Sequence, residues 1–319
     1  MLFTKFEFGS WWHGLYIIAP IIITLILYFL LRKRSYTTRY IIGVIIGIAS
    51  LGVLIMRNVD IYMHNGFDPE IIPLQVCHFG NIMVFLALVF KSKTATAVSF
   101  SLNMIWAFVS HIEAQSLSHY NDVFSIRAQA YIWGHMLIVI GSLYAVLLKI
   151  VRIKWKDFGF GCIVIIALLI PSIIMNSYFN DFRAGEFNHI NYFYIYDSEG
   201  VPFEFLYGIV DRSKYGWFTI DWVYTAGVFG IGLAIMFFIY SFHHLVYIKD
   251  KDFDTHHIFY NLFHKNKNEI SFEETKEDIK EVPEKEFINK IVVKNSNAAD
   301  ETYLNTKSNI VIIKKEKKD

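Results

Sequence analysis

Seven apolar runs, most of them close to 20 residues long, follow one another as far as residue 243. An α-helix needs about 20 apolar residues to cross roughly 30 Å of hydrocarbon, because it rises about 1.5 Å per residue. Each run therefore has the length of a transmembrane helix. The fold we predict is an all-α membrane protein, a seven-transmembrane-helix bundle with spans at about 13–31, 40–56, 73–90, 95–112, 129–149, 159–178 and 220–243.

The overall composition agrees with a membrane protein. Hydrophobic residues make up 54% of the chain, aromatic residues 17%, and the mean hydropathy is +0.37. A soluble domain of this length would leave too much of that apolar surface in water. The first run is not typical of a secretory signal, because its basic cluster, Arg32 to Arg34, follows the apolar stretch. We therefore predict a multi-pass protein of the cell membrane.

Basic residues are concentrated in alternate connections between the predicted spans. Lysine and arginine near span ends are retained on the cytoplasmic side of a membrane. The connections after spans 1, 3 and 5 hold ten of them, namely Arg32, Lys33, Arg34, Arg39, Lys91, Lys93, Lys149, Arg152, Lys154 and Lys156. The other connections hold few. This pattern predicts an amino terminus outside and a carboxyl terminus in the cytoplasm.

The chain divides by composition into a seven-helix transmembrane domain, 1–245, and a charged tail, 246–319, that we expect to be largely disordered. The tail is a candidate site for a cytoplasmic protein partner. The connection 179–219 is long and aromatic, which is typical either of a lid or of an interfacial aromatic belt. A net charge of +1, with basic residues close to span ends, argues against a nucleic-acid partner.

Polar side chains inside the predicted spans gather at one depth. Such groups are expensive in hydrocarbon, so they indicate either a functional pocket or packing contacts between helices. With the predicted orientation, most lie in the external halves of spans 3 to 7, which favours a pocket that opens outward. They are Gln75, Cys77, His78, Asn81, Asn103, His111, His135, Ser172, Asn176 and Asp221.

The third span carries the residue with the clearest chemistry, Cys77. Pro73 suits the first turn of this helix, which places Cys77 about one turn in, near the positive end of the helix dipole. That position favours a thiolate, although a cysteine in a membrane helix is more often an inert small residue. Two cysteines, Cys77 and Cys162, at opposite membrane faces would remain free thiols.

A thiolate, a histidine and amide donors together form a set suited to acyl transfer. We predict Cys77 as the nucleophile and His135 as the proton acceptor, with His78 as the alternative base and Asn81 or Gln75 as the oxyanion donor. No cofactor is expected beyond a membrane phospholipid. The residues predicted to support the pocket are Gln75, His78, Asn81, Asn103, His111 and Asp221.

Three other functions fit parts of the pattern. The same histidines with Asn103 and Asp221 could line the path of a small-molecule transporter or binding protein. His78, His111 and His135 with Asp221 could hold zinc in a seven-helix lipid hydrolase, although no H-x-x-x-H or H-E-x-x-H pair occurs in any span. A scaffold acting through the tail is the third.

Short sequence islands resemble the YwaF family of bacterial integral membrane proteins, which is similar to the animal transmembrane protein 164 acyltransferases. The islands are Pro73 to His78, Gly134-His135 and Asn191 to Tyr194, and the likeness covers roughly residues 10–245. It implies transfer of phospholipid acyl chains through a cysteine thioester, with Cys77 as the acyl acceptor and His135 as its partner. Gln75 and His78 depart from the family pattern, where histidine and aspartate stand.

Overall fold

The computed structural model describes residues 8–113, 117, 122–198, 204–247, 291–293 and 302–304. Within this part of the chain, seven helices are long and apolar enough to cross a membrane, which confirms the predicted class. They span Trp11–Leu31, Tyr36–Asn65, Pro69–Val89, Lys93–Ile112, Ile126–Leu147, Trp155–Phe182 and Trp222–Val246. The direction in which the chain crosses the membrane stays a prediction.

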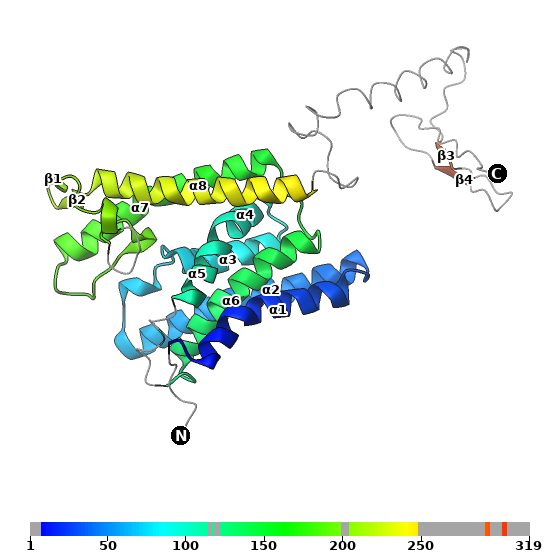
Figure 1. Cartoon of the computed structure of the whole chain (residues 1–319), viewed down its shortest axis with the longest axis horizontal. Helices are drawn as coiled ribbons and strands as arrows, with labels where there is room; N and C mark the ends of the chain where they lie inside the picture. Colours follow the sequence, from blue (N-terminus) through cyan, green and yellow to red (C-terminus); the bar gives the residue numbers. More distant parts are fainter. Residues whose placement is uncertain are drawn as a thin grey trace, which may run out of the picture. The chain divides into compact units, whose positions relative to one another are not determined.

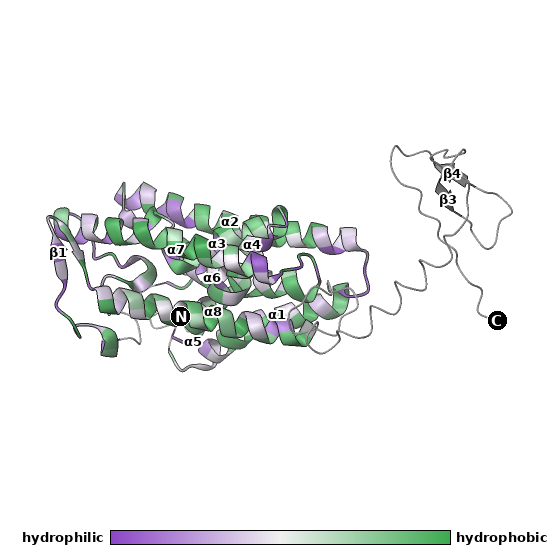
Figure 2. Ribbon diagram, turned by 90° about the horizontal axis from the view of Figure 1, so that it is seen from above, coloured by the Kyte–Doolittle hydropathy of each residue, from purple (hydrophilic) through white to green (hydrophobic). Residues whose placement is uncertain are grey.

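The long helices of residues 8–247 run side by side (Figure 1). Hydrophobic residues cover most of their length (Figure 2). Helix α6 (Ile126–Leu147) packs against α1 (Trp11–Leu31), α2 (Tyr36–Asn65), α3 (Val76–Val89) and α5 (Met104–Ile112). Many apolar side chains on α1, α2, α7 (Trp155–Ser177) and α8 (Trp222–Tyr247) are exposed, as expected for surfaces that face lipid.

Helix α2 extends nine residues beyond the predicted span, from residue 56 to Asn65. The charges that ended the predicted span are paired, so they do not stop the helix. Arg57 Nη2 contacts Glu70 Oε2 at 2.6 Å, and Arg127 Nε contacts Asp60 Oδ2 at 3.0 Å. The helix ends at Gly66, whose φ of 72° suits glycine.

The start of α3 differs from the prediction. The helix begins at Val76 with Gln75 as its N-cap, so Pro73 is not in its first turn. A separate 3-10 turn, η1 (Pro69–Ile71), comes first; its cap is Asp68, which accepts a hydrogen bond from the Glu70 N–H. The backbone turns again between Ile72 and Leu74 before α3 starts. Cys77 is therefore the second residue of the helix rather than one turn in.

The fourth span is not a regular α-helix. Between α4 (Lys93–Val98) and α5 lies a π-helical turn, η2 (Ser99–Asn103), and a second one, η4 (Tyr178–Phe182), extends α7. Within η2, Ser101 Oγ donates to the Ala97 carbonyl at 2.5 Å, and Ser99 is hydrogen-bonded to Ser142 of α6. A π turn inside an α-helix is uncommon and is often found at functional sites.

The connection between α7 and α8 has its own short elements. They are η5 (Tyr192–Tyr194), η6 (Glu204–Leu206) and an antiparallel pair, β1 (Ser213–Tyr215) and β2 (Phe218–Ile220), in which Ser213 pairs with Ile220. In the tail, β3 (Ile291–Val293) pairs antiparallel with β4 (Thr302–Leu304). The rest of 248–319 lies outside the described residues, so the predicted disorder there stays a prediction.

Candidate functional site

Cys77 occupies the first turn of α3 and is half-buried. The first backbone hydrogen bond of this helix runs from the Phe79 N–H to the Gln75 carbonyl at 2.9 Å. The N–H groups of Val76, Cys77 and His78 therefore have no acceptor within the helix, and the Gln75 side chain does not cap them. Such N–H groups stabilise negative charge at a helix amino terminus.

His135 lies on α6 and is buried, with 6% of its surface exposed. Its Nδ1 is 2.7 Å from the Tyr131 carbonyl oxygen, and the Tyr131 ring lies against it at a centroid distance of 4.3 Å. A carbonyl only accepts hydrogen bonds, so Nδ1 carries the proton and Nε2 carries the lone pair. In this tautomer, Nε2 is the atom that can take up a proton.

His111 of α5 lies beside His135, and the two ring centroids are 6.2 Å apart in an edge-to-face arrangement. Its Nδ1 donates to the Ala107 carbonyl at 2.5 Å, and Tyr16 stacks on its ring at 4.3 Å. Its Nε2 has no hydrogen-bond partner among the described residues. The prediction that His111 and His135 share one depth therefore agrees with the geometry.

The first span adds two residues that the sequence did not single out, His13 and Tyr16. The Gly9 N–H donates to His13 Nδ1 at 3.1 Å, so Nε2 carries the proton and donates to the His111 carbonyl at 2.9 Å. The sequence feature that could have identified them is their i, i+3 spacing at the start of the span, which places both side chains on one helix face. Together they attach α1 to α5 beside the histidines.

Asn81 joins α3 to α2 one turn beyond Cys77. Its Nδ2 donates to the Cys77 carbonyl of the same helix at 3.0 Å, and its Oδ1 accepts from Ser50 Oγ of α2 at 2.8 Å. A Cβ built on Gly134, the neighbour of His135, would lie 3.6 Å from the same Nδ2, so α6 passes close to this amide. Asn81 therefore braces α3 against α2; its predicted role as an oxyanion donor stays a prediction.

Two more predicted residues surround the start of α3. Asn103 of η2 donates from Nδ2 to the Val76 carbonyl at 3.0 Å, so it fixes the backbone next to Cys77. His78 is buried, and its Nδ1 has no hydrogen-bond partner within the described ranges. Gln75 is the N-cap residue. These side chains lie around the same helix end, as predicted.

Asp221 and Asn176 instead hold the backbone at the ends of α8 and α7. Asp221 Oδ1 accepts from the Tyr224 N–H at 2.8 Å, which caps α8, and Oδ2 accepts from the Gly208 N–H at 3.3 Å. Asn176 makes two hydrogen bonds with the backbone of Tyr192, at 2.7 and 3.0 Å. Their predicted depth stays a prediction, and the hydrogen bonds they make are those of residues that hold the backbone.

Residues Tyr192 to Tyr196, here called the aromatic cap, are fastened from several sides. Asn176 holds Tyr192, whose hydroxyl donates to the Pro69 carbonyl at 2.5 Å, and Thr225 Oγ1 of α8 donates to the Ile195 carbonyl at 3.3 Å. Phe193 and Tyr194 have φ values of 54° and 55°. Such left-handed conformations cost about 1–3 kcal/mol each in non-glycine residues, so these contacts must enforce them.

Tyr194 brings the aromatic cap close to Cys77. Burial raises the pKa of the Tyr194 phenol well above its usual value, and the nearby Cys77, Tyr131 and Glu113 raise it further. Since Tyr131 also contacts the His135 ring, Tyr194 lies close to both parts of the site. The Asn191 to Tyr194 island is therefore part of the region around Cys77.

Replacing Asn81 with leucine should destabilise the helix bundle. The Ser50 hydroxyl would lose the Asn81 amide oxygen as its acceptor, and a buried polar group left unsatisfied costs about 1–3 kcal/mol. Thermal unfolding in detergent should show a lower midpoint for Asn81→Leu, whereas Asn188→Leu, at an exposed position, should match the wild type. Equal midpoints for the two variants would rule out the bracing role.

The zinc hypothesis requires that His78, His111, His135 and Asp221 lie close enough together to bind one ion. Among the described residues, no group of three or more histidine, cysteine, aspartate or glutamate side chains is arranged to hold a metal ion. His111 and His135 lie together, but Asp221 is engaged by the backbone of the α8 amino end.

The fold defines a multi-pass membrane protein, in which histidine and tyrosine rings from α1, α5 and α6 are in contact with one another. The chain belongs to the TMEM164 family, whose model matches residues 8–241. No curated protein and no solved structure matches it.

Proposed function

We propose that this protein is an acyltransferase that moves acyl chains between membrane phospholipids through a thioester on Cys77. The observation that carries the proposal is the position of Cys77 in the first turn of α3, whose N-cap side chain makes no capping hydrogen bond, with the Asn81 amide bonded to the Cys77 carbonyl. Acyl transfer through a cysteine is also the activity that the resemblance to the animal acyltransferases implies.

In the first step, His135 Nε2 accepts the thiol proton and Cys77 Sγ attacks the ester carbonyl carbon of a phospholipid. The Sγ–C bond forms, and the C–O bond to glycerol breaks. The leaving alkoxide takes the proton back from His135, which releases a lysophospholipid. This assignment of roles is supported by the Nδ1 hydrogen bond to Tyr131, which leaves the lone pair on Nε2.

In the second step, the hydroxyl of another lysophospholipid gives its proton to His135 and attacks the thioester. The new ester bond forms, and Cys77 leaves as a thiolate that regains the proton. Water in place of the lysophospholipid would give a hydrolase. Both steps pass through an oxyanion, and the N–H groups of the first turn of α3, which have no backbone acceptor in the helix, are suited to stabilise it.

The full-length protein in lipid nanodiscs tests the proposal with a phosphatidylcholine that carries a terminal alkyne on one acyl chain. We expect a hydroxylamine-sensitive alkyne adduct on the peptide that contains Cys77. A chase with lysophospholipid should move the label into new phospholipid, whereas release only as free fatty acid would indicate a hydrolase. Absence of an adduct together with an unchanged lipid profile would overturn the proposal.

A further inference from the structure

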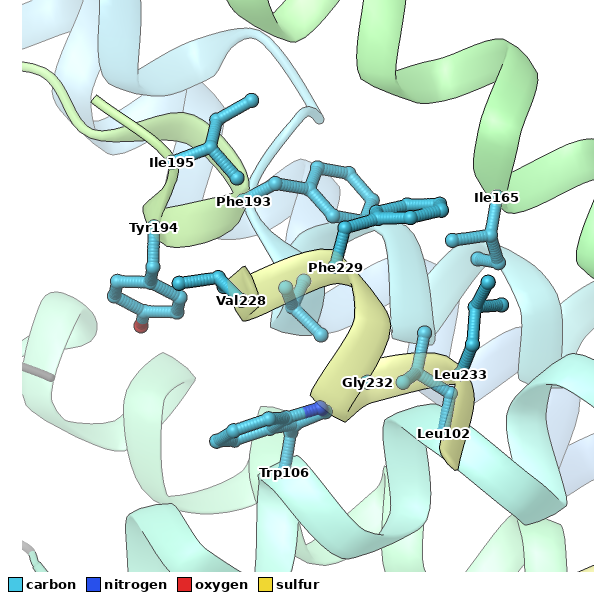
Figure 3. Close-up of a pocket in the computed structure, with 11 residues that line it drawn as sticks. Leu102, Trp106, Ile165, Phe193, Tyr194, Ile195, Val228, Phe229, Gly232 and Leu233 are labelled. Carbon is cyan, nitrogen blue, oxygen red and sulfur yellow. The ribbon is translucent and has the colours of Figure 1, made fainter. Parts of the chain in front are cut away.

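An apolar cavity lies between α5, α7 and α8 beneath the aromatic cap (Figure 3). Its empty volume is about 460 Å³, including the part that opens to the outside. Phe193 and Phe229 lie at one end of it and Trp106 at the other. The whole lining is Val76, Leu102, Trp106, Ile165, Phe193, Tyr194, Ile195, Val228, Phe229, Gly232 and Leu233. It offers almost no polar partner to a ligand.

The cavity lies at the depth of the hydrocarbon. Leu102, Ile165 and Gly232 line it, and each falls well inside a helix long enough to span a membrane. An apolar cavity of this kind stays dry, and the only abundant apolar molecules at that depth are lipid chains. Its opening therefore faces hydrocarbon, and an acyl chain can enter without crossing water.

Two residues join this cavity to Cys77. Val76 lines the cavity and is the residue before Cys77, with its carbonyl held by Asn103. Tyr194 also lines the cavity, and it lies near enough to Cys77 for the two side chains to interact electrostatically. A chain held in the cavity would therefore have its polar end near Cys77.

We propose that this cavity holds one acyl chain of a membrane phospholipid, with the ester carbonyl directed toward Cys77. This inference rests on the proposed function for the identity of the ligand, and it adds the binding site that positions the chain. It also explains why the cap is held in a costly backbone conformation: Phe193 and Tyr194, the two residues with left-handed backbone, both line the cavity.

Gly232 provides a way to fill the cavity without disturbing the helices. A Cβ at this position would meet only Leu102, at 3.9 Å, which is ordinary van der Waals contact. A leucine side chain there has room to project into the cavity. Gly230 on the same helix is exposed and has nothing within 4 Å of its Cβ position, so Gly230→Leu is a matched control.

The test uses a phosphatidylcholine with a diazirine in the middle of one acyl chain, photolysed in nanodiscs with the full chain carrying Cys77→Ser. We expect crosslinks on the peptides that contain Trp106 and Phe229. Gly232→Leu should reduce them strongly, because its side chain occupies the space that the acyl chain would fill. Gly230→Leu should leave them unchanged.

Crosslinks confined to the outer faces of α1 and α2, or crosslinks that Gly232→Leu does not reduce, would overturn the proposal. A parallel experiment uses a free fatty acid that carries the same diazirine. If only this probe labels the cavity, the bound chain does not come from a phospholipid and the proposal is wrong. Because Cys77→Ser removes the thiol, the crosslink reports on the cavity independently of catalysis. The thioester experiment can therefore fail while the chain-binding site stands, and the reverse also holds.

Discussion

Replacing Cys77 with serine should reduce acyl transfer by about 1,000-fold or more, the size of effect seen when an enzyme loses its nucleophile. Serine keeps the shape of the side chain, but its hydroxyl ionises far less readily than a thiol. The nucleophilic anion that the first turn of α3 would stabilise is therefore not formed. The measurement is the rate at which a labelled acyl chain moves from phospholipid to lysophospholipid in nanodiscs.

Cys162 provides the matched control. It is the other free cysteine, also half-buried, and it lies within α7. Cys162→Ser should transfer acyl chains at the wild-type rate, and both variants should elute and unfold as the wild type does. Wild-type transfer by Cys77→Ser would exclude the thioester mechanism, whereas loss in both variants would point to a general effect of serine on the bundle.

The spans could be predicted from the sequence because hydropathy over about 20 residues is a local property. Their exact ends could not, since they depend on partners distant in the chain. Arg57 ended a predicted span because an unpaired charge is unfavourable in hydrocarbon, yet Glu70 pairs with it and α2 continues. The turn η1 likewise depends on that contact and moves the start of α3 to Val76.

Helical spacing could predict which polar residues lie close together, but not what their hydrogen bonds do. Helical spacing and orientation placed Cys77, His111 and His135 at one level, and the ring contact between the two histidines agrees with this. Depth alone cannot separate a reactive group from a brace, because that depends on which atoms are already hydrogen-bonded. Asn81 and Asp221 are engaged by backbone groups, which no spacing in the sequence reveals.

The residues that sequence reasoning missed are mainly aromatic. Tyr16 and Tyr131 lie near span ends, where tyrosine is common for reasons of membrane anchoring, so their presence carries little information. Only the folded chain shows that each ring lies against a histidine of the site. The connection 179–219 was predicted as a lid or a belt; within it, the aromatic cap makes hydrogen bonds with α7, α8 and η1 that hold it in place.

Replacing Gly141 with alanine should destabilise the bundle by about 1–3 kcal/mol, the usual cost of overpacking a close contact. A Cβ at this position of α6 would lie 2.5 Å from Val84 Cγ1 of α3, far inside van der Waals distance, with Leu88 and Ile46 also close. Helix α3 would have to move away from α6. Gly141→Val, with two further methyl groups, should prevent accumulation of folded protein.

Two variants make this prediction specific to the contact with Val84. Gly52 has nothing within 4 Å of its Cβ position, so Gly52→Ala should be neutral or stabilising, because alanine favours helix over glycine by about 1 kcal/mol. Val84→Ala in the Gly141→Ala background should recover much of the loss, since it removes the atom that clashes. The measurement is the unfolding midpoint in detergent for Gly141→Ala, for Val84→Ala and for the variant that carries both. If the two losses simply add, the helices do not meet at Gly141 as closely as the structure places them.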